Sequence, residues 1–238
     1  MKDLNYRYAT AGTADRAGVD AGLRSHMLRV YNYMASGVLL SGIVAFLVAS
    51  SPAAVQLLFG TPLKWLVMLS PLAFVMVLSF GIHRLSFGAA QALYWAFCAV
   101  MGASLATILL VFTGASVARV FFITAGTFAA MSLYGYTTKA DLSKFGTFLI
   151  MGLIGIVIAS LVNIFIGSSA VQFAISVIGV LVFVGLTAWD TQRIKEEYFL
   201  LGSSGEASKA ALMGALSLYL NFINLFTMLM NLFGSRND

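Results

Sequence analysis

Seven long apolar segments, joined by short polar connections, dominate the hydrophobic pattern of the chain. Each approaches the ~20 residues that a helix needs to cross the hydrocarbon core of a bilayer. The segments are 30–49, 63–82, 88–112, 117–137, 145–167, 170–190 and 210–233. This pattern predicts an all-α integral membrane protein with seven transmembrane helices in one domain over residues 30–233.

The last segment carries a polar stripe that the others lack. Ser217, Asn221, Asn224, Met228 and Asn231 are spaced by four, three, four and three residues, so they share one face of a helix. Polar side chains in hydrocarbon are costly unless they face protein or water. We therefore expect a central seventh helix wrapped by the others, with its amides in interhelical hydrogen bonds.

The two ends of the chain are polar. Residues 1–29 contain no continuous apolar core, which is not the pattern of a cleaved signal peptide. We expect them to form a flexible cytoplasmic tail, and residues 234–238 to form a short C-terminal tail.

The composition agrees with a membrane protein. The chain is 60% hydrophobic and 10% charged, with a mean hydropathy of +0.93, whereas a soluble domain carries roughly 25% charged residues. One cysteine, Cys98, excludes a disulfide within the chain and a metal site built from several cysteines. The basic residues lie mostly at the ends of apolar segments, where they set topology, so we expect no nucleic-acid partner.

Counting Lys and Arg on alternate sides of the segments gives an orientation. The side that holds the N-terminal tail and the even-numbered connections has eleven, and the other side has three. Because cytoplasmic loops carry the excess of basic residues, we expect a cytoplasmic N terminus and a C terminus on the opposite side.

Small residues and one proline suggest how the helices pack. Pairs of small residues four apart let helices approach closely, and they occur at Gly37–Ser41, Gly102–Ala106, Gly126–Ala130 and Gly155–Ala159. Pro71, inside the second segment, is expected to kink that helix and to free a carbonyl in the preceding turn.

Motifs of soluble enzymes are missing from the sequence. There is no glycine-rich phosphate loop, no HExxH, no GxSxG and no Cys/His cluster, and no second intramembrane acid accompanies Asp190 as an aspartyl protease would require. His26 and His83 flank helices, and we interpret both as interfacial residues. We expect neither enzymatic activity nor a bound cofactor.

Asp190 ends the sixth segment and is the acidic residue best placed for a chemical role. One interpretation is an interfacial carboxylate paired with Arg193, Lys195 or Arg84. The other is a proton-sensitive latch. Arg84 itself is first a positive anchor at the end of the second segment.

Two C-terminal motifs resemble one known family. Residues Trp189 to Lys195 (WDTQRIK) and Ser217 to Phe226 (SLYLNFINLF) are similar to the end of the Bax inhibitor-1 family, the transmembrane Bax inhibitor motif proteins, in its bacterial branch. The resemblance spans about residues 28–234. It implies a seventh helix surrounded by the other six, a pH-sensitive calcium leak, and a role in stress or cell-death suppression. It also implies the bacterial inner membrane and, in bacterial members, modulation of a membrane protease.

The resemblance also implies a sensor. In the family, aspartates on helices six and seven form the sensor, and an arginine at the end of helix two latches onto the first. Asp190 matches the first aspartate and Arg84 the arginine, but Asn221 replaces the second aspartate. Because an Asp–Asn pair lacks repulsion between carboxylates, we expect a pH response at more acidic values. Asn224, Arg193 and Lys195 are the supporting polar residues.

Losing one carboxylate weakens any calcium site. Calcium takes roughly six to eight oxygen ligands, whereas the membrane segments offer Asp190 and the neutral donors Asn163, Asn221 and Asn224. We expect transient calcium contact at Asp190 and no resident metal. The alternative function is a non-conducting interaction protein that modulates a membrane protease or a stress response. A transporter is less favoured, because the sequence has no inverted repeat or pair of broken helices.

The segment boundaries conflict with a contact between Asp190 and Asn221. Asn221 is eleven residues into segment 210–233, roughly 16 Å along a helix, whereas Asp190 is at the end of its own segment. The pair can form only if the seventh helix begins outside the bilayer, around residues 206–215, or if the sixth is tilted.

Overall fold

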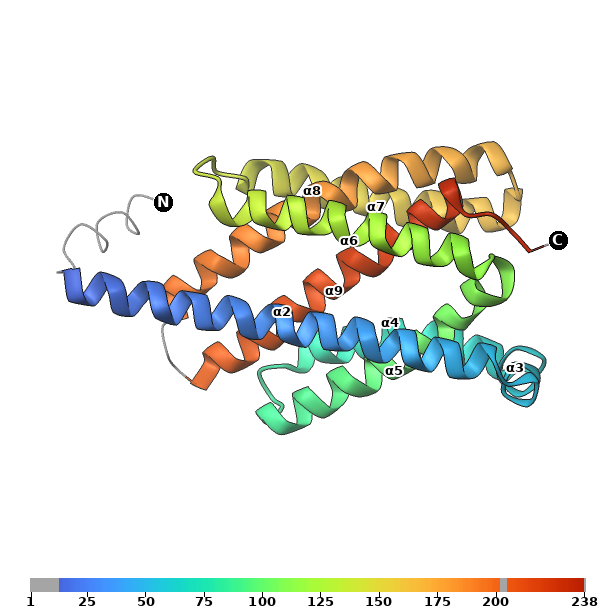
Figure 1. The fold of residues 1–238 in the computed structure, drawn as a ribbon, viewed down its shortest axis with the longest axis horizontal. Helices are drawn as coiled ribbons and strands as arrows, with labels where there is room; N and C mark the ends of the chain where they lie inside the picture. The colour runs from blue at the N-terminus through green and yellow to red at the C-terminus, as the bar shows by residue number, and fades with distance from the viewer. Residues whose placement is uncertain (1–12, 202–204, 238) are drawn as a thin grey trace.

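Eight helices make up most of residues 13–201 and 205–237, which the computed structural model describes (Figure 1). Seven are long and apolar enough to cross a membrane, which confirms the predicted all-α fold. The helices are α2 (Thr13–Ala49), α3 (Pro52–Phe59), α4 (Leu63–Gly81), α5 (Phe87–Val111), α6 (Gly114–Thr137), α7 (Ser143–Ile166), α8 (Ser169–Leu201) and α9 (Gly205–Phe233). The pattern of apolar segments did not predict the short helix α3.

Polar caps and one glycine set several helix boundaries. The side chains of Ser51, Ser86 and Thr113 accept hydrogen bonds from backbone amides three residues later, at 3.3, 3.2 and 3.3 Å. Gly167 ends α7 with a left-handed φ of 66°, which glycine adopts without strain. These local signals place the turns of the bundle.

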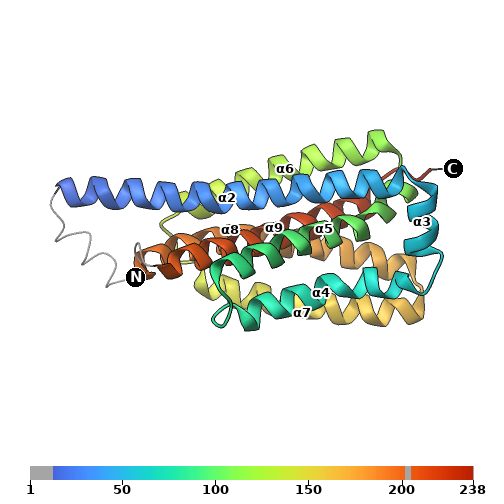
Figure 2. The same cartoon turned by 90° about the horizontal axis from the view of Figure 1, so that it is seen from below.

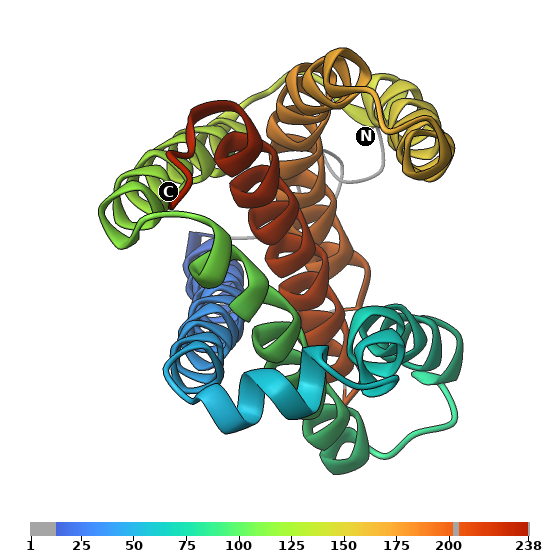
Figure 3. The same ribbon diagram turned by 90° about the vertical axis from the view of Figure 1, so that its right-hand side faces the viewer.

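Helix α9 is the axis of the bundle, as its polar stripe predicts. It packs against α2, α5, α6 and α8 (Figure 3), and 67% of its most apolar window is buried, compared with 17% in α4 and in α7. The buried Tyr219 of α9 is within 2.6 Å of Ser41 of α2, hydroxyl to hydroxyl. Helices α4 and α7 lie at the periphery, on α5 and α8, so the expectation that six helices surround α9 is wrong for these two.

The first helix is longer than the apolar pattern predicts. Helix α2 begins at Thr13, so the expected flexible tail is wrong over residues 13–29, and residues 1–12 lie outside the described part. Leu23, Met27, Val30 and Met34 form a buried stripe at helical spacing. Arginines between these positions lower the hydropathy and hide the helix from a count of apolar residues. Figure 2 shows α2 projecting past the ends of its neighbours.

The C-terminal segment follows α9 as expected and is tied to the bundle. The Ser235 carbonyl accepts a hydrogen bond from the backbone N–H of Thr113 at 2.9 Å. The backbone N–H of Asn237 donates to the Val111 carbonyl at 2.9 Å. Residue 238 lies outside the described part. The start of α2 and the end of α9 lie at opposite ends of the bundle (Figure 1).

Two of the four predicted small-residue pairs make close helix contacts. Gly37 faces Tyr94, Cys98 and Tyr219, and Gly102 faces the backbone of Ser41. The pairs that begin at Gly126 and Gly155 are wrong, because both glycines face open space on the outer surface.

Pro71 frees a carbonyl, as predicted, and a neighbouring helix uses it. Helix α4 continues through the buried proline, which has no N–H to donate to Val67. The Ser104 hydroxyl of α5 donates to that carbonyl at 2.6 Å instead. The proline therefore creates a hydrogen bond between α4 and α5.

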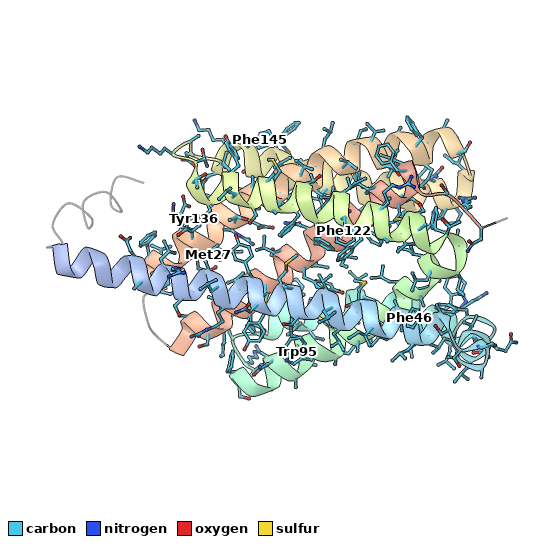
Figure 4. All side chains as sticks on the ribbon, viewed as in Figure 1. Met27, Phe46, Trp95, Phe122, Tyr136 and Phe145 are labelled. Atoms are coloured by element: carbon cyan, nitrogen blue, oxygen red, sulfur yellow. The ribbon has the colours of Figure 1, made fainter. Side chains whose placement is uncertain are left out.

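Large apolar side chains cover the outside of the bundle. Phe46, Phe122 and Phe145 are exposed and lie on its outer surface (Figure 4). A surface of this kind suits a lipid environment, where apolar side chains face hydrocarbon. The protein is therefore a multi-pass membrane protein.

Candidate functional site

The centre of the candidate site is a hydrogen bond between α8 and α9. The Asn221 amide donates to Oδ2 of Asp190 at 2.7 Å, and the two residues are only 5% and 4% exposed. A charged acceptor strengthens such a bond. The predicted contact between these two residues is therefore present in the structure.

Helix lengths remove the conflict between the segment boundaries and this contact. The predicted end of the sixth segment at residue 190 is wrong, because α8 continues for eleven residues to Leu201. Helix α9 begins at Gly205, sixteen residues before Asn221. Charged residues after Asp190 lower the hydropathy, whereas Thr191, Gln192 and Ile194 remain buried and keep the helix packed.

Arg193, one turn further along α8, forms the second contact of the carboxylate. Its guanidinium is 2.7 Å from Oδ1 of Asp190 and donates to the Ser217 hydroxyl of α9 at 3.0 Å. The approach to Oδ1 is an ion pair that does not meet hydrogen-bond geometry, and Oδ1 accepts no hydrogen bond from the described residues. The Arg193 side chain is 47% exposed and that of Asp190 6% exposed. The arginine therefore covers the carboxylate on the side that leads to the surface.

The predicted latch between Arg84 and Asp190 is not found. Arg84 is exposed in the turn after α4, and no ion pair joins it to Asp190 within the described part of the chain. Helix α4 packs on α3 and α5 rather than on α8, which holds Arg84 away. Arg193 occupies the position that we expected for Arg84, because a spacing of three residues places it on the same face as Asp190.

The other predicted polar residues serve neighbouring contacts. Lys195 donates to the Tyr136 carbonyl at 2.8 Å and lies 5.1 Å from the centre of the Tyr136 ring, so it joins α8 to α6. Asn224 donates within its own helix to Leu220 at 2.9 Å. Asn231 is exposed. The expectation of interhelical hydrogen bonds is therefore wrong for Asn224, and no described bond supports it for Asn231.

The possible oxygen ligands for calcium are fewer than expected. Asn163 lies at the end of α7 and bonds to Gln172 and Ser168 at 3.3 and 3.1 Å, in the connection to α8. Within the described residues, no group of three or more His, Cys, Asp or Glu could hold a metal ion. Asp190 and Asn221 are the donors that the structure brings together.

A sequence model of the family described as "Inhibitor of apoptosis-promoting Bax1" matches residues 23–238. The chain belongs to the Bax inhibitor-1 family. This match covers both helices of the candidate site.

Relatives in several bacteria are similar over nearly their whole length. The Inner membrane protein YbhL of Escherichia coli K12 is 48% identical over 219 residues, which cover 91% of this chain and 94% of that protein. A protein of Rickettsia prowazekii, named as uncharacterized, is 44% identical over 99% of this chain and all of its own length. An uncharacterized membrane protein of Streptococcus pyogenes is 37% identical over 92% of this chain and 96% of its own length.

In this Bax inhibitor-1 family protein, the residues next to Asp190 fix α8 to three other elements. A chain of hydroxyls runs from Tyr31 of α2 to Ser132 of α6 at 2.6 Å and on to Thr191 at 3.0 Å. Gln192 donates to the Ala140 carbonyl at 2.8 Å and accepts from the Leu142 amide at 2.9 Å. We did not predict these contacts, although Thr191 and Gln192 belong to the WDTQRIK motif.

Glycines bring the neighbouring helices close to this part of α8. Gly135 of α6 lies against the Ala188 carbonyl, and Gly146 of α7 lies against the Trp189 ring. Arg193 also lies over that ring, with its guanidinium 5.1 Å from the ring centre. The Asp190 region is therefore held between α6, α7 and α9.

The half of α9 beyond Asn221 is an apolar barrier. Its buried side chains are Phe222, Ile223, Leu225, Phe226, Leu229 and Met230. A bare ion in apolar surroundings is very costly. The polar side chains of Asn224 and Thr227 lie half-buried in the same part of the helix.

Proposed function

We propose that this Bax inhibitor-1 family protein supports a proton-dependent leak of calcium or another cation, with Asp190 as the proton-responsive gate. The main support is the buried carboxylate of Asp190, held by Asn221 of α9 and by Arg193. Ionisable residues inside a membrane are rare and typically functional. The family and the name of the Escherichia coli relative support the bacterial inner membrane as its location.

The gating step follows from the two partners of Asp190. When ionised, the carboxylate attracts Arg193, which also binds Ser217 of α9, so α8 and α9 are held together. Protonation removes the charge, and Arg193 is released toward the surface. Both hydrogen bonds between α8 and α9 then weaken, because the Asn221 amide loses its charged acceptor and the carboxylate no longer holds Arg193 beside Ser217.

Opening requires movement of α9 as well. Its buried apolar half blocks the route beyond Asn221, so we infer that the structure is the closed state. A calcium ion would contact Asp190 only in passing, because conduction requires weak binding.

Purified protein in liposomes tests for a leak. We expect entry of calcium, followed with a trapped indicator, to exceed that of protein-free liposomes and to increase as the external pH falls. Entry equal to that of empty liposomes at every pH would contradict the proposal.

The alternative is a non-conducting protein that modulates a membrane protease. It is favoured by the single carboxylate, which Arg193 already neutralises, and by the apolar barrier along α9. A chain that lacks residues 1–12 retains the sequence of every described helix, and its loss of protease binding without a change in unfolding temperature would support this alternative.

A further inference from the structure

A groove of about 630 Å³ lies along α2, next to the start of α5. Helix α2 provides most of its wall, and Trp95 of α5 provides the rest. Its lining includes Arg24, Ser25, Arg29, Asn32, Tyr33 and Trp95. We call it the α2 groove. It is separate from the Asp190 site, none of whose residues line it.

The α2 groove is positively charged. Arg24 and Arg29 are both exposed, and none of the described residues that line the groove is acidic. Arg29 donates from one terminal nitrogen to the Ser208 hydroxyl of α9 at 3.2 Å. An arginine has five N–H donors, so this bond orients the guanidinium and leaves further donors for a ligand. Ser25 and Asn32 add exposed neutral polar groups on the same helix.

The groove lies at the level of a membrane surface. Helix α2 has 37 residues, about 55 Å at 1.5 Å per residue, which exceeds the ~30 Å of a hydrocarbon core. Its apolar segment begins at residue 30, directly after Arg29, so the arginines lie at the boundary. Trp95 and Tyr33 line it with ring centres 6.0 Å apart, and Trp95 lies beside α2 (Figure 4). Trp and Tyr are enriched at membrane–water interfaces.

We propose that the α2 groove binds the headgroup of an anionic phospholipid. Arg24 and Arg29 bind the phosphate, since guanidinium groups match phosphate geometry. Ser25 and Asn32 bind headgroup hydroxyls, and Trp95 packs against the glycerol region. The groove favours a headgroup without an ammonium, because an ammonium would bring a positive charge close to the two arginines. Since Arg29 also bonds to α9, the bound lipid stabilises the contact between α2 and the first turns of α9.

This inference does not depend on the proposed leak, and lipid binding tests it directly. The full chain is purified in detergent and titrated with phosphatidylglycerol or phosphatidylcholine, and bound lipid is counted by native mass spectrometry. We expect a preference of at least about tenfold for phosphatidylglycerol, based on two basic contacts. The double variant Arg24→Gln, Arg29→Gln is expected to lose most of that preference.

A matched double variant, Arg119→Gln and Lys144→Gln, controls for total charge. Both residues are exposed and lie on α6 and α7, outside the groove, so the preference should remain. If the first double variant does not fold, Arg24→Gln alone should still reduce the preference severalfold. Equal preference in wild type and the Arg24 variants, or equal loss in the control, would overturn the proposal. Displacement of the lipid by millimolar inorganic phosphate at constant ionic strength would overturn it in favour of a free-anion site.

Discussion

Asp190 divides its two oxygens between a neutral partner and a cationic partner. Oδ2 accepts from Asn221 and Oδ1 faces Arg193, both at 2.7 Å. Each contact favours the ionised carboxylate, whereas its burial favours the neutral acid. A change of pH, or the replacement of one partner, can therefore shift Asp190 between its ionised and its neutral form.

Replacing Asn221 by aspartate tests the amide partner. In Asn221→Asp, two carboxylates would be placed within hydrogen-bond distance, and they would share a proton rather than both ionise. The proton would be bound at higher pH, so the midpoint of pH-dependent flux should rise. Asn224→Asp, one turn further along α9, is the matched control, because Asn224 contacts its own helix. An unchanged midpoint in Asn221→Asp would contradict this role of Asn221.

Removing the Arg193 charge tests the ionic partner. In Arg193→Gln the buried carboxylate loses its cation, and we expect a destabilisation of about 1–3 kcal/mol, between the values for exposed and for buried pairs. The difference from wild type should shrink at acidic pH, because protonated Asp190 no longer needs the cation. Unfolding by denaturant in detergent micelles measures both effects.

Arg84→Gln is the control for Arg193→Gln. Its side chain is exposed and away from Asp190, so its effect should remain within about 0.5 kcal/mol. An Arg84 variant that destabilises the protein as much as the Arg193 variant would favour the latch that the sequence suggests.

Prediction from the sequence succeeded for Asp190 and Asn221, and it included Arg193 among three possible cations, whereas the latch by Arg84 is not found. The contact between the two followed from motif similarity, although the segment boundaries argued against it. Arg84 and Arg193 both follow membrane segments in the sequence. The spacing of three residues favours Arg193 if the helix continues past Asp190, whereas the packing of α4 on α3 and α5, which keeps Arg84 away, has no local signal.

At the scale of elements, burial rather than hydropathy decides where the helices begin and end. Helices α2 and α8 extend beyond their apolar segments because one face remains packed while charged residues occupy the other. A hydropathy average mixes the two faces, so the apolar segment begins later than α2 and ends earlier than α8. Ser86 and Thr113 cap the starts of α5 and α6, and these local signals were not used by the apolar pattern, which placed the start of α6 three residues late, at residue 117.

The proline of α4 allows a test of helix packing. Ser104→Ala should leave the Val67 carbonyl without a donor and cost about 1–3 kcal/mol of unfolding free energy. Adding Pro71→Ala restores an N–H within α4, so the Ser104→Ala cost should be smaller in that background. Thr107→Ala, which loses only a bond within α5, is the matched control. Equal Ser104→Ala costs with and without the proline would contradict the contact.

At the scale of the whole molecule, the seven spans and the central helix could be predicted from the sequence. Their number follows from length and apolarity, and the place of α9 follows from its polar stripe. The peripheral positions of α4 and α7 could not be predicted, because an apolar helix has no marked face in lipid. Gly126 and Gly155 have the spacing of packing motifs but face open space. The spacing alone does not show whether that face of the helix meets another helix or lipid.

The orientation of the bundle remains a prediction from its basic residues. We expect Lys144→Cys to react with a membrane-impermeant thiol reagent only from the cytoplasmic side, and Ala115→Cys only from the opposite side. Both positions are exposed, and the single native cysteine, Cys98, is fully buried and serves as an internal control. Labelling of Ala115→Cys from the cytoplasmic side would reverse the topology.

The Asp141→Asn variant provides the control for a pH-dependent measurement. Asp141 is exposed in the connection between α6 and α7, where the hydrogen bond from the Ser143 amide lowers the pKa of its carboxyl. This acid therefore stays ionised until the pH falls below its usual range. Its removal should leave a pH profile unchanged.

The pH dependence of cation flux through Asp190→Asn tests the central proposal most directly. Asparagine resembles the protonated acid in shape and charge, so it should leave Arg193 without an anionic partner at every pH. We expect calcium entry into liposomes to be high in this variant and independent of pH, whereas wild type and Asp141→Asn conduct more as the pH falls. An Asp190→Asn profile that follows wild type across the same pH range would contradict gating by this carboxylate.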